Sequence, residues 1–285
     1  MDLDGKLRAH FNALYGDGRA VEPYRRPSLP IRKTYCILIT PRSGSTWLTR
    51  RIARLDVLSC PDEFFNVNEF GNTLKFNPGR DIYEVFDLVA RKNCTDSGLF
   101  GFEMSYFDLA EFEREAKLLD VMLGEKHFFY LSRRNFVAQA ISLFTAVESG
   151  VFHTYQSDAV ERLPIPYDGD KIRYWACHIL QQEYGFQRWL DANEVWPVRL
   201  SYEDLLDDVD GTIRRIARHL GVDLARAGAR AIPQTEKITA DGAAEYEHRF
   251  RHEHREFCQA WSELRGTAPC PFPEIPSGQQ SCRQS

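Results

Sequence analysis

The 285-residue sequence predicts an α/β fold in which helices cover both faces of a central parallel sheet. Short, continuous apolar runs such as TYCILIT (34–40) and HFFYLS (127–132) are typical of strands that are buried on both faces. Longer segments with apolar residues at helical spacing lie between these runs. This alternation favours a parallel sheet, because parallel strands need long crossover connections that are usually helical.

Each element is predicted from its own pattern. Apolar runs predict strands at 34–40, 98–104, 127–132 and 195–200. The last of these is expected to be short, because it contains a proline. Helical spacing predicts helices at 44–58, 80–92, 108–123, 135–150, 168–191, 201–208 and 211–221. Ser201 and Asp204 have the spacing of a capping box, and Gly221 is placed to end the last helix.

No internal repeat is visible, and we expect one domain with an extension at each end. Residues 1–33 form a lead-in whose second half is punctuated by prolines, and residues 34–265 form the domain. Residues 266–285 are rich in Pro, Gly, Ser and Gln, so we expect a loosely held tail.

Composition narrows the class of protein. A net charge of −5 argues against a nucleic-acid partner, so an anionic ligand must be bound by local arginines. We expect neither a signal peptide, since the N-terminus is charged, nor a transmembrane segment, since no apolar run is long enough. Seven scattered cysteines without a CxxC pair indicate free thiols and a cytoplasmic location. A disulfide between two of the three C-terminal cysteines is the alternative.

The loop TPRSGSTW (40–47) follows the first strand and opens a helix. A glycine-containing loop in this place directs backbone N–H groups and the positive end of the helix dipole at an anion. Arg42 adds a guanidinium that can bind oxyanions bidentately. The lysine of a nucleotide-binding GxxxxGK[ST] loop is missing, so the sequence predicts a P-loop-like three-layer fold with an altered loop. The alternative is an ordinary turn from strand to helix.

A second motif, RRNFVAQAIS (133–142), follows the third strand. Arg133 and Arg134 leave the strand end together, and Ser142 lies two turns into the next helix. The pair could be solvated on the surface, but the carboxyl ends of parallel strands share one edge of the sheet. Two anion sites at this edge predict a nucleotide that carries phosphates at both ends.

Together these motifs resemble those of sulfotransferases that use 3′-phosphoadenosine 5′-phosphosulfate (PAPS). TPRSGSTWL is similar to the family's 5′-phosphosulfate loop, and RRNFVAQAIS is similar to its 3′-phosphate motif. Arg134 lies eight residues before Ser142, which is the usual family spacing, and Arg133 lies nine before it. Which arginine binds the phosphate therefore stays open.

The resemblance implies PAPS as co-substrate and adenosine 3′,5′-bisphosphate (PAP) as product. We expect no metal, because the transferred group carries less charge than the γ-phosphate of a kinase substrate. Arg42 would stabilise the leaving phosphate in an in-line transfer. The nucleotide would be bound by loop residues and by residues of later segments: Arg42, Ser43, Gly44, Ser45, Thr46, Trp47, Arg133, Arg134, Ser142 and Lys237. Lys237 has an ordinary surface lysine as its alternative.

PDEFF (61–65) narrows the resemblance to a bacterial carbohydrate branch, which includes trehalose 2-sulfotransferases and nodulation-factor sulfotransferases. That branch implies a small-molecule or glycolipid acceptor and Glu63 as general base, and it leaves a homodimer open. Phe64 and Phe65 would exclude water and raise the pKa of Glu63. Asp62 is the local competitor, and a solvated loop carboxylate is the alternative for Glu63.

The sequence departs from the branch at Glu103, where a lysine is common. Residues 66–79 and 153–169 match nothing in the branch, and we expect them to choose the acceptor. Histidines 248, 252 and 254 lie among charged residues and indicate a solvated helix face. Two other classes stay open: a degenerate P-loop kinase or NTPase, and a non-catalytic nucleotide-binding protein.

Overall fold

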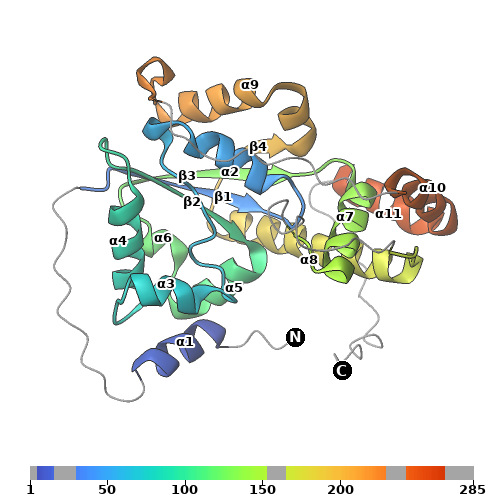
Figure 1. The fold of residues 1–285 in the computed structure, drawn as a ribbon, viewed down its shortest axis with the longest axis horizontal. Coiled ribbons are helices and arrows are strands. Elements are labelled where there is room, and N and C mark those ends of the chain that lie inside the picture. The colour runs from blue at the N-terminus through green and yellow to red at the C-terminus, as the bar shows by residue number, and fades with distance from the viewer. Residues whose placement is uncertain (1–4, 16–29, 153–164, 229–241, 267–285) are drawn as a thin grey trace.

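The computed structural model describes residues 5–15, 30–152, 165–228 and 242–266 (Figure 1). Its centre is a four-stranded sheet in which every pair of neighbouring strands is parallel. The strand order is β2-β1-β3-β4, with bounds of Leu99–Ser105, Lys33–Ile39, Glu125–Ser132 and Val198–Ser201. Each predicted apolar run overlaps one of these strands, so the predicted parallel sheet is confirmed.

The strand order places the two arginine motifs next to each other. The chain passes from β1 to β2 on one side and then crosses to β3 on the other side of β1. Ile39 at the end of β1 lies opposite Ser105 of β2 and Leu131 of β3, so the three strands end nearly level. The loops that follow them leave from one edge, where open α/β sheets bind their ligands.

Two helices cover one face of the sheet, α2 (Ser45–Ala53) and α9 (Tyr202–Leu220) (Figure 1). Tyr35, Ile37 and Ile39 of β1 contribute to the apolar cluster beneath these helices. The first turn of α2 therefore lies directly above the end of β1.

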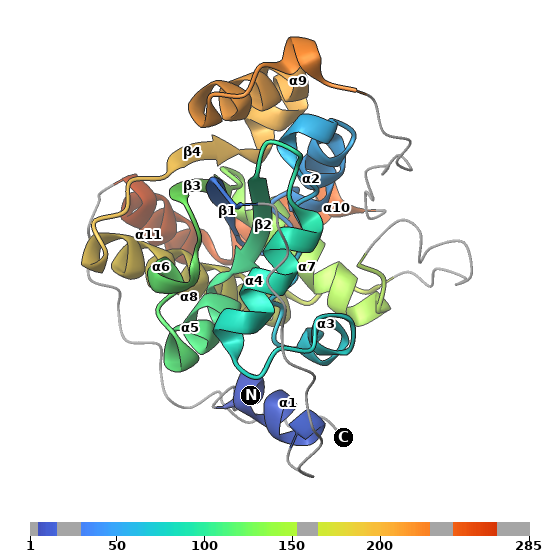
Figure 2. The same cartoon turned by 90° about the vertical axis from the view of Figure 1, so that its left-hand side faces the viewer.

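The opposite face carries a larger apolar cluster, to which Cys36 and Leu38 of β1 contribute. Helices on this side are α4 (Ile82–Asn93), α5 (Tyr106–Glu115), α6 (Leu118–Val121) and the second half of α8 (Gly169–Ala192). The short helices α1 (Lys6–Tyr15) and α3 (Phe70–Phe76) lie outside them (Figures 1 and 2). The sheet with its two helical faces makes the three predicted layers.

A third apolar cluster lies beyond the carboxyl ends of the strands. It joins α7 (Phe136–Ser149) and the first half of α8 to α10 (Ala243–Glu253) and α11 (Arg255–Gly266). Trp261 of α11 is buried and stacks on Phe136, with 4.3 Å between the ring centroids. This stack holds the start of α7, which carries the second arginine motif.

The predicted single helix over 108–123 is wrong, because α5 ends at Glu115 and α6 starts at Leu118. Ala116 between them is extended, with φ −160° and ψ 149°. The Glu113 carboxylate accepts the Leu118 N–H at 2.8 Å and so supports the start of the second helix.

Two further boundaries differ from the prediction. The helix expected over 44–58 ends at Ala53 and is followed by a separate 3₁₀ turn, Asp56–Leu58. The helices expected at 201–208 and 211–221 are joined into α9, which is kinked at Asp208. Their predicted ends are confirmed: the Ser201 hydroxyl accepts the Asp204 N–H at 3.1 Å, and Gly221 ends the helix in a left-handed conformation.

Some predictions fall on residues that the structure does not describe: Lys237, 153–164, 267–285 with Cys270 and Cys282, and the proline-punctuated 16–29. The described cysteines are free thiols: Cys36, Cys60, Cys94, Cys177 and Cys258. Across the described ranges, every helix is either too short or too polar to cross a membrane. Within the lead-in, α1 contacts α5 and α3, and the Leu7 N–H donates to Glu111 at 3.3 Å.

The segment that contains Glu63 is anchored by Phe65, which is buried among phenylalanine rings. The Phe65 ring stacks on Phe86 at 5.1 Å and meets Phe102 at 5.5 Å and Phe112 at 5.6 Å, edge to face. These rings belong to α4, β2 and α5. Phe65 therefore fixes the loop after α2 to three elements of the core.

We predict that Phe65→Ala lowers the free energy of unfolding by about 3–5 kcal/mol, the usual cost of removing a buried aromatic side chain. Phe76→Ala is the control, because Phe76 is 74% exposed. That variant should stay within about 0.5 kcal/mol of the wild type. Urea unfolding followed by circular dichroism measures both, and equal losses would contradict the anchor.

Candidate active site

The first loop turns sharply between β1 and α2. Arg42 and Gly44 both have left-handed backbones, with φ of 63° and 87°, and the Ser43 N–H donates to the Thr40 carbonyl at 3.2 Å. Gly44 is the N-cap residue of α2. The turn therefore places the first helical N–H groups, which have no partners within the helix, at the carboxyl edge of the sheet.

Gly44 is needed for close packing as well as for its conformation. A Cβ atom at this position would lie 2.6 Å from Cδ2 of Tyr202. Tyr202 is the first residue of α9 and directly follows β4. The glycine thus lets the first loop contact the first residue of α9.

Gln139 ties the first loop to α7, a role that the sequence analysis missed. Its side chain is fully buried, and Nε2 donates to the Thr40 hydroxyl at 2.9 Å and to the Pro41 carbonyl at 2.7 Å. A polar residue within an otherwise apolar helical stretch was the available signal, because a buried amide needs hydrogen-bond partners.

The structure brings Arg42, Arg133 and Ser142 together, as the two motifs predicted. Arg42 Nε donates to the Ser142 hydroxyl at 3.0 Å, and its Nη1 donates to the Phe152 carbonyl at 2.7 Å. Arg133 Nη1 lies 3.5 Å from the carbonyl oxygen of Arg42. The first loop, the end of β3 and the middle of α7 therefore meet at these side chains.

The two arginines form a half-buried cluster of positive charge. Burial lowers the pKa of Arg42, the charge of Arg133 lowers it further, and Tyr202 acts in the opposite direction. Burial also lowers the pKa of Arg133, against weaker raising effects of Tyr202, Glu203 and Glu247. Among the described residues, neither guanidinium forms an ion pair. Because arginine stays protonated, this pair suits a bound anion.

Unsatisfied buried donors point to the same kind of ligand. The Ser43 hydroxyl and Arg133 Nε are buried and have no hydrogen-bond partner. The Arg133 guanidinium lies over the Tyr202 ring, 4.5 Å from its centroid. Buried polar groups are normally paired, so these donors fit the oxygen atoms of a phosphate or a sulfate group.

Arg134 points away from this cluster. Its Nη1 pairs with Asp204 at 3.1 Å, and its Nε lies 3.8 Å from Glu203, both at the start of α9. The side chain is 62% exposed. Of the two adjacent arginines, only Arg133 faces Arg42.

Arg265 supports the second motif from α11 and was also missed. Its Nη1 donates to the carbonyl of Arg133 at 2.8 Å and to that of Arg134 at 3.0 Å. It also forms an ion pair with Glu183 of α8. No pattern in the sequence marks this residue, because its partners lie far away along the chain.

A second cluster, of carboxyl groups, lies at the start of α2. Glu103 of β2 is only 4% exposed; the Ser45 hydroxyl hydrogen-bonds to it, while its Oε2 has no partner. Its N–H donates to the Asp62 carbonyl at 3.1 Å. Burial raises the pKa of Glu103 well above its usual range, and the charges of Glu63 and Asp62 raise it further.

Glu63 is half-buried in this cluster, unlike a solvated loop carboxylate. Its Oε2 accepts a hydrogen bond from Asn66 at 2.8 Å. Burial raises the pKa of Glu63, the Asn66 hydrogen bond opposes this rise, and Asp108 and Asp62 add to it. A carboxylate with a raised pKa is a better proton acceptor.

The remaining predicted residues of the first loop belong to α2. Thr46 lies in its first turn, and its carbonyl accepts the Thr49 hydroxyl at 3.5 Å. Trp47 is partly buried against the cluster beneath α2 and α9. The described ranges contain no group of three or more His, Cys, Asp or Glu residues that could hold a metal ion.

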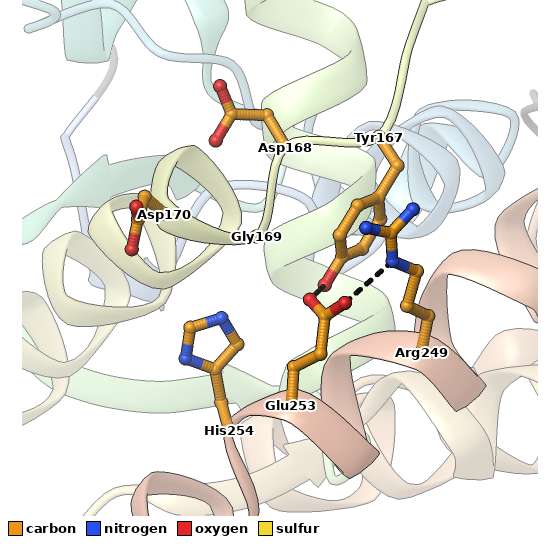
Figure 3. Close-up of a pocket in the computed structure, with 7 residues that line it drawn as sticks. All are labelled: Tyr167, Asp168, Gly169, Asp170, Arg249, Glu253 and His254. Atoms are coloured by element: carbon orange, nitrogen blue, oxygen red, sulfur yellow. Dashed lines mark hydrogen bonds and ion pairs between the residues drawn. The ribbon is translucent and has the colours of Figure 1, made fainter.

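A shallow pocket of about 390 Å³ lies elsewhere, between the start of α8 and α10 (Figure 3). Tyr167 donates to Glu253 at 2.6 Å, and Arg249 Nε lies 2.7 Å from the same carboxylate. The pocket shares no residue with either cluster: Tyr167, Asp168, Gly169, Asp170, Arg249, Glu253 and His254. We therefore place the candidate active site at the two clusters that meet at the first loop.

Residues 34–253 match a family model described as Stf0 sulphotransferase. Trehalose 2-sulfotransferase of Mycobacterium tuberculosis (strain ATCC 35801 / TMC 107 / Erdman) is 21% identical, over 78% of this chain and 95% of the relative. The sulfotransferase domain of the Synechococcus PCC 7002 olefin synthase is 17% identical over 71% of this chain and 78% of that one, with a TM-score of 0.45. The sulfotransferase domain from the curacin biosynthetic pathway is 14% identical over 79% and 98%, with a TM-score of 0.42.

The matched region contains both arginine motifs and PDEFF, and it spans well over half of the chain. It confirms the predicted resemblance to sulfotransferases. The degenerate kinase and the non-catalytic nucleotide-binding protein are set aside by the same match. The chain belongs to the Stf0 sulphotransferase family and is a sulfotransferase, an enzyme that transfers sulfuryl groups.

Proposed function

We propose that this enzyme takes the sulfuryl group from PAPS, passes it to a hydroxyl of a carbohydrate or glycolipid-type acceptor and releases PAP. The half-buried contact between Arg42 and Arg133 carries the proposal, because each arginine comes from a different strand end and lacks an ion-pair partner among the described residues. A nucleotide with phosphates at both ends would neutralise both charges.

The position of each residue at a strand end or helix start suggests which phosphate group of the nucleotide it would bind. Around the 5′-phosphosulfate we place the start of α2, with Arg42, Ser43, Gly44, Ser45 and Thr46.

For the 3′-phosphate we favour Arg133 with Ser142, because Arg134 is engaged by Glu203 and Asp204. Lys237 remains a proposed nucleotide contact.

The bound donor supplies an activated sulfuryl group for in-line transfer, by analogy with phosphoryl transfer. Arg42 would stabilise the charge that grows on the leaving phosphate. Glu63 would accept the proton of the acceptor hydroxyl as the new S–O bond forms and the old one breaks. Its half-buried position and raised pKa suit this role.

We infer the acceptor class from the similarity to trehalose 2-sulfotransferase, a relative whose name indicates a carbohydrate acceptor. Residues 66–79, which contain α3, follow Glu63 directly and would contribute to acceptor choice together with 153–169. Mass spectrometry of a cell extract incubated with enzyme and PAPS tests this assignment. Sulfated sugars or glycolipids are the expected products, and sulfation of phenols or proteins alone would contradict the class.

We predict that Arg133→Ala weakens PAP binding by about 10- to 100-fold, the usual effect of losing a charged hydrogen bond. Arg134→Ala is the matched control and should change the affinity less than about threefold, because its charge is already paired on α9. Isothermal calorimetry measures both. An equal or larger loss in Arg134→Ala would show that the wrong arginine has been chosen.

For the base, we predict that Glu63→Gln lowers kcat by about 10²- to 10⁴-fold while PAP still binds. Asp62→Asn is the control and should retain most of the rate. Since a base must be ionised, wild-type turnover should fall as the pH falls through the raised pKa of Glu63. A rate lost in Asp62→Asn and kept in Glu63→Gln would reverse the assignment.

A further inference from the structure

The mechanism above gives no role to Glu103, a carboxyl group inside the proposed donor site. It lies on β2, opposite Ile37 of β1, at the position where the resembling branch often has a lysine. Its side chain is 4% exposed and its Oε2 has no hydrogen-bond partner. A buried carboxylate in such a place is costly unless it is paired or protonated.

Glu103 connects the two halves of the site. The Ser45 hydroxyl hydrogen-bonds to it from the first residue of α2. Its backbone N–H holds the Asp62 carbonyl at 3.1 Å, directly before Glu63. The charge state of Glu103 therefore acts on the proposed anion site through Ser45 and on the proposed base through the neighbouring loop.

The groups around Glu103 favour its neutral form. Its charged neighbours, Glu63 and Asp62 from the loop, are both acidic. From β1, Tyr35 lies on the same face of the sheet as Glu103, and burial raises the pKa of its hydroxyl, to which Cys60 and Glu103 add. Cys36 lies on the other face, and burial, together with Glu103, raises the pKa of its thiol. Both groups therefore stay neutral near pH 7. No basic side chain forms an ion pair with it within the described ranges.

We propose that Glu103 is a positioning residue that must carry a proton whenever the site holds the phosphosulfate end of the donor, so that donor binding takes up a proton here at any pH at which Glu103 of the free protein is ionised. The proposal rests on the proposed function. An ionised Glu103 can only accept hydrogen bonds, so it would keep the proton of the Ser45 hydroxyl turned towards itself. A neutral Glu103 can donate to Ser45, whose own proton is then free to bind an anionic oxygen.

Electrostatics work in the same direction. A carboxylate one hydrogen bond from the start of α2 would repel an anion bound there and would oppose the helix dipole. If only the protonated form binds the donor, the affinity falls by about tenfold for each pH unit above the pKa of Glu103 in the free protein.

Calorimetry of PAP binding, in buffers that differ in ionisation enthalpy, tests the inference without any acceptor. At any pH at which Glu103 of the free protein is ionised, the wild type should take up more protons than Glu103→Gln, by up to about one proton. Titration of the nucleotide phosphates is common to both proteins and cancels in the difference. The affinity of Glu103→Gln should also decline less as the pH rises.

Glu125→Gln is the matched control, because Glu125 is exposed at the opposite end of β3 and should leave the proton uptake of the wild type unchanged. If Glu103→Gln does not fold, Glu103→Lys takes its place and should bind PAP without the additional proton. Equal proton uptake by the wild type and by a folded Glu103 variant, at a pH at which Glu103 of the free protein is ionised, overturns the inference and leaves the proposed function standing. Failure of the wild type to bind PAP at any pH overturns both.

Discussion

The constraint on which the site depends is the repulsion between two half-buried guanidinium groups, those of Arg42 and Arg133. Arg42 and Arg133 come from neighbouring parallel strands that end at the same level, so the sheet itself brings them together. Such a contact is unfavourable without an anion, and the fold must supply the energy to maintain it. Two hydrogen-bonding side chains hold the arginines in place. Gln139 binds the first loop, and Arg265 binds backbone carbonyls of the second arginine motif. A ligand of opposite charge then finds its donors already in place.

The carboxyl cluster has the opposite charge and lies at the other end of the same loop. Ser45 belongs to this cluster through Glu103, whereas Arg42 belongs to the positive one through Ser142. A short turn with two left-handed residues thus separates the part of the site that suits anions from the part that suits proton transfer.

Local patterns predicted the parallel sheet and the meeting of Arg42, Arg133 and Ser142, because strand ends in such a sheet share an edge. Local patterns could not distinguish Arg133 from Arg134, because the difference depends on carboxylates of α9 some 70 residues later in the chain. The break at Ala116 was missed because a side chain, Glu113, supplies the capping bond. Buried supports such as Gln139 and Arg265 act through distant partners, and a single sequence does not show those contacts.

The hydrogen bond from Arg265 to Arg133 joins residues that are 132 positions apart. During synthesis on the ribosome, the strand end that carries Arg133 therefore emerges long before the helix that supports it. Contacts of such high sequence separation close large loops and generally form late in folding. The sheet can be complete while the second motif still lacks the support of Arg265, so the newly made chain should complete the proposed nucleotide site as one of its last folding events.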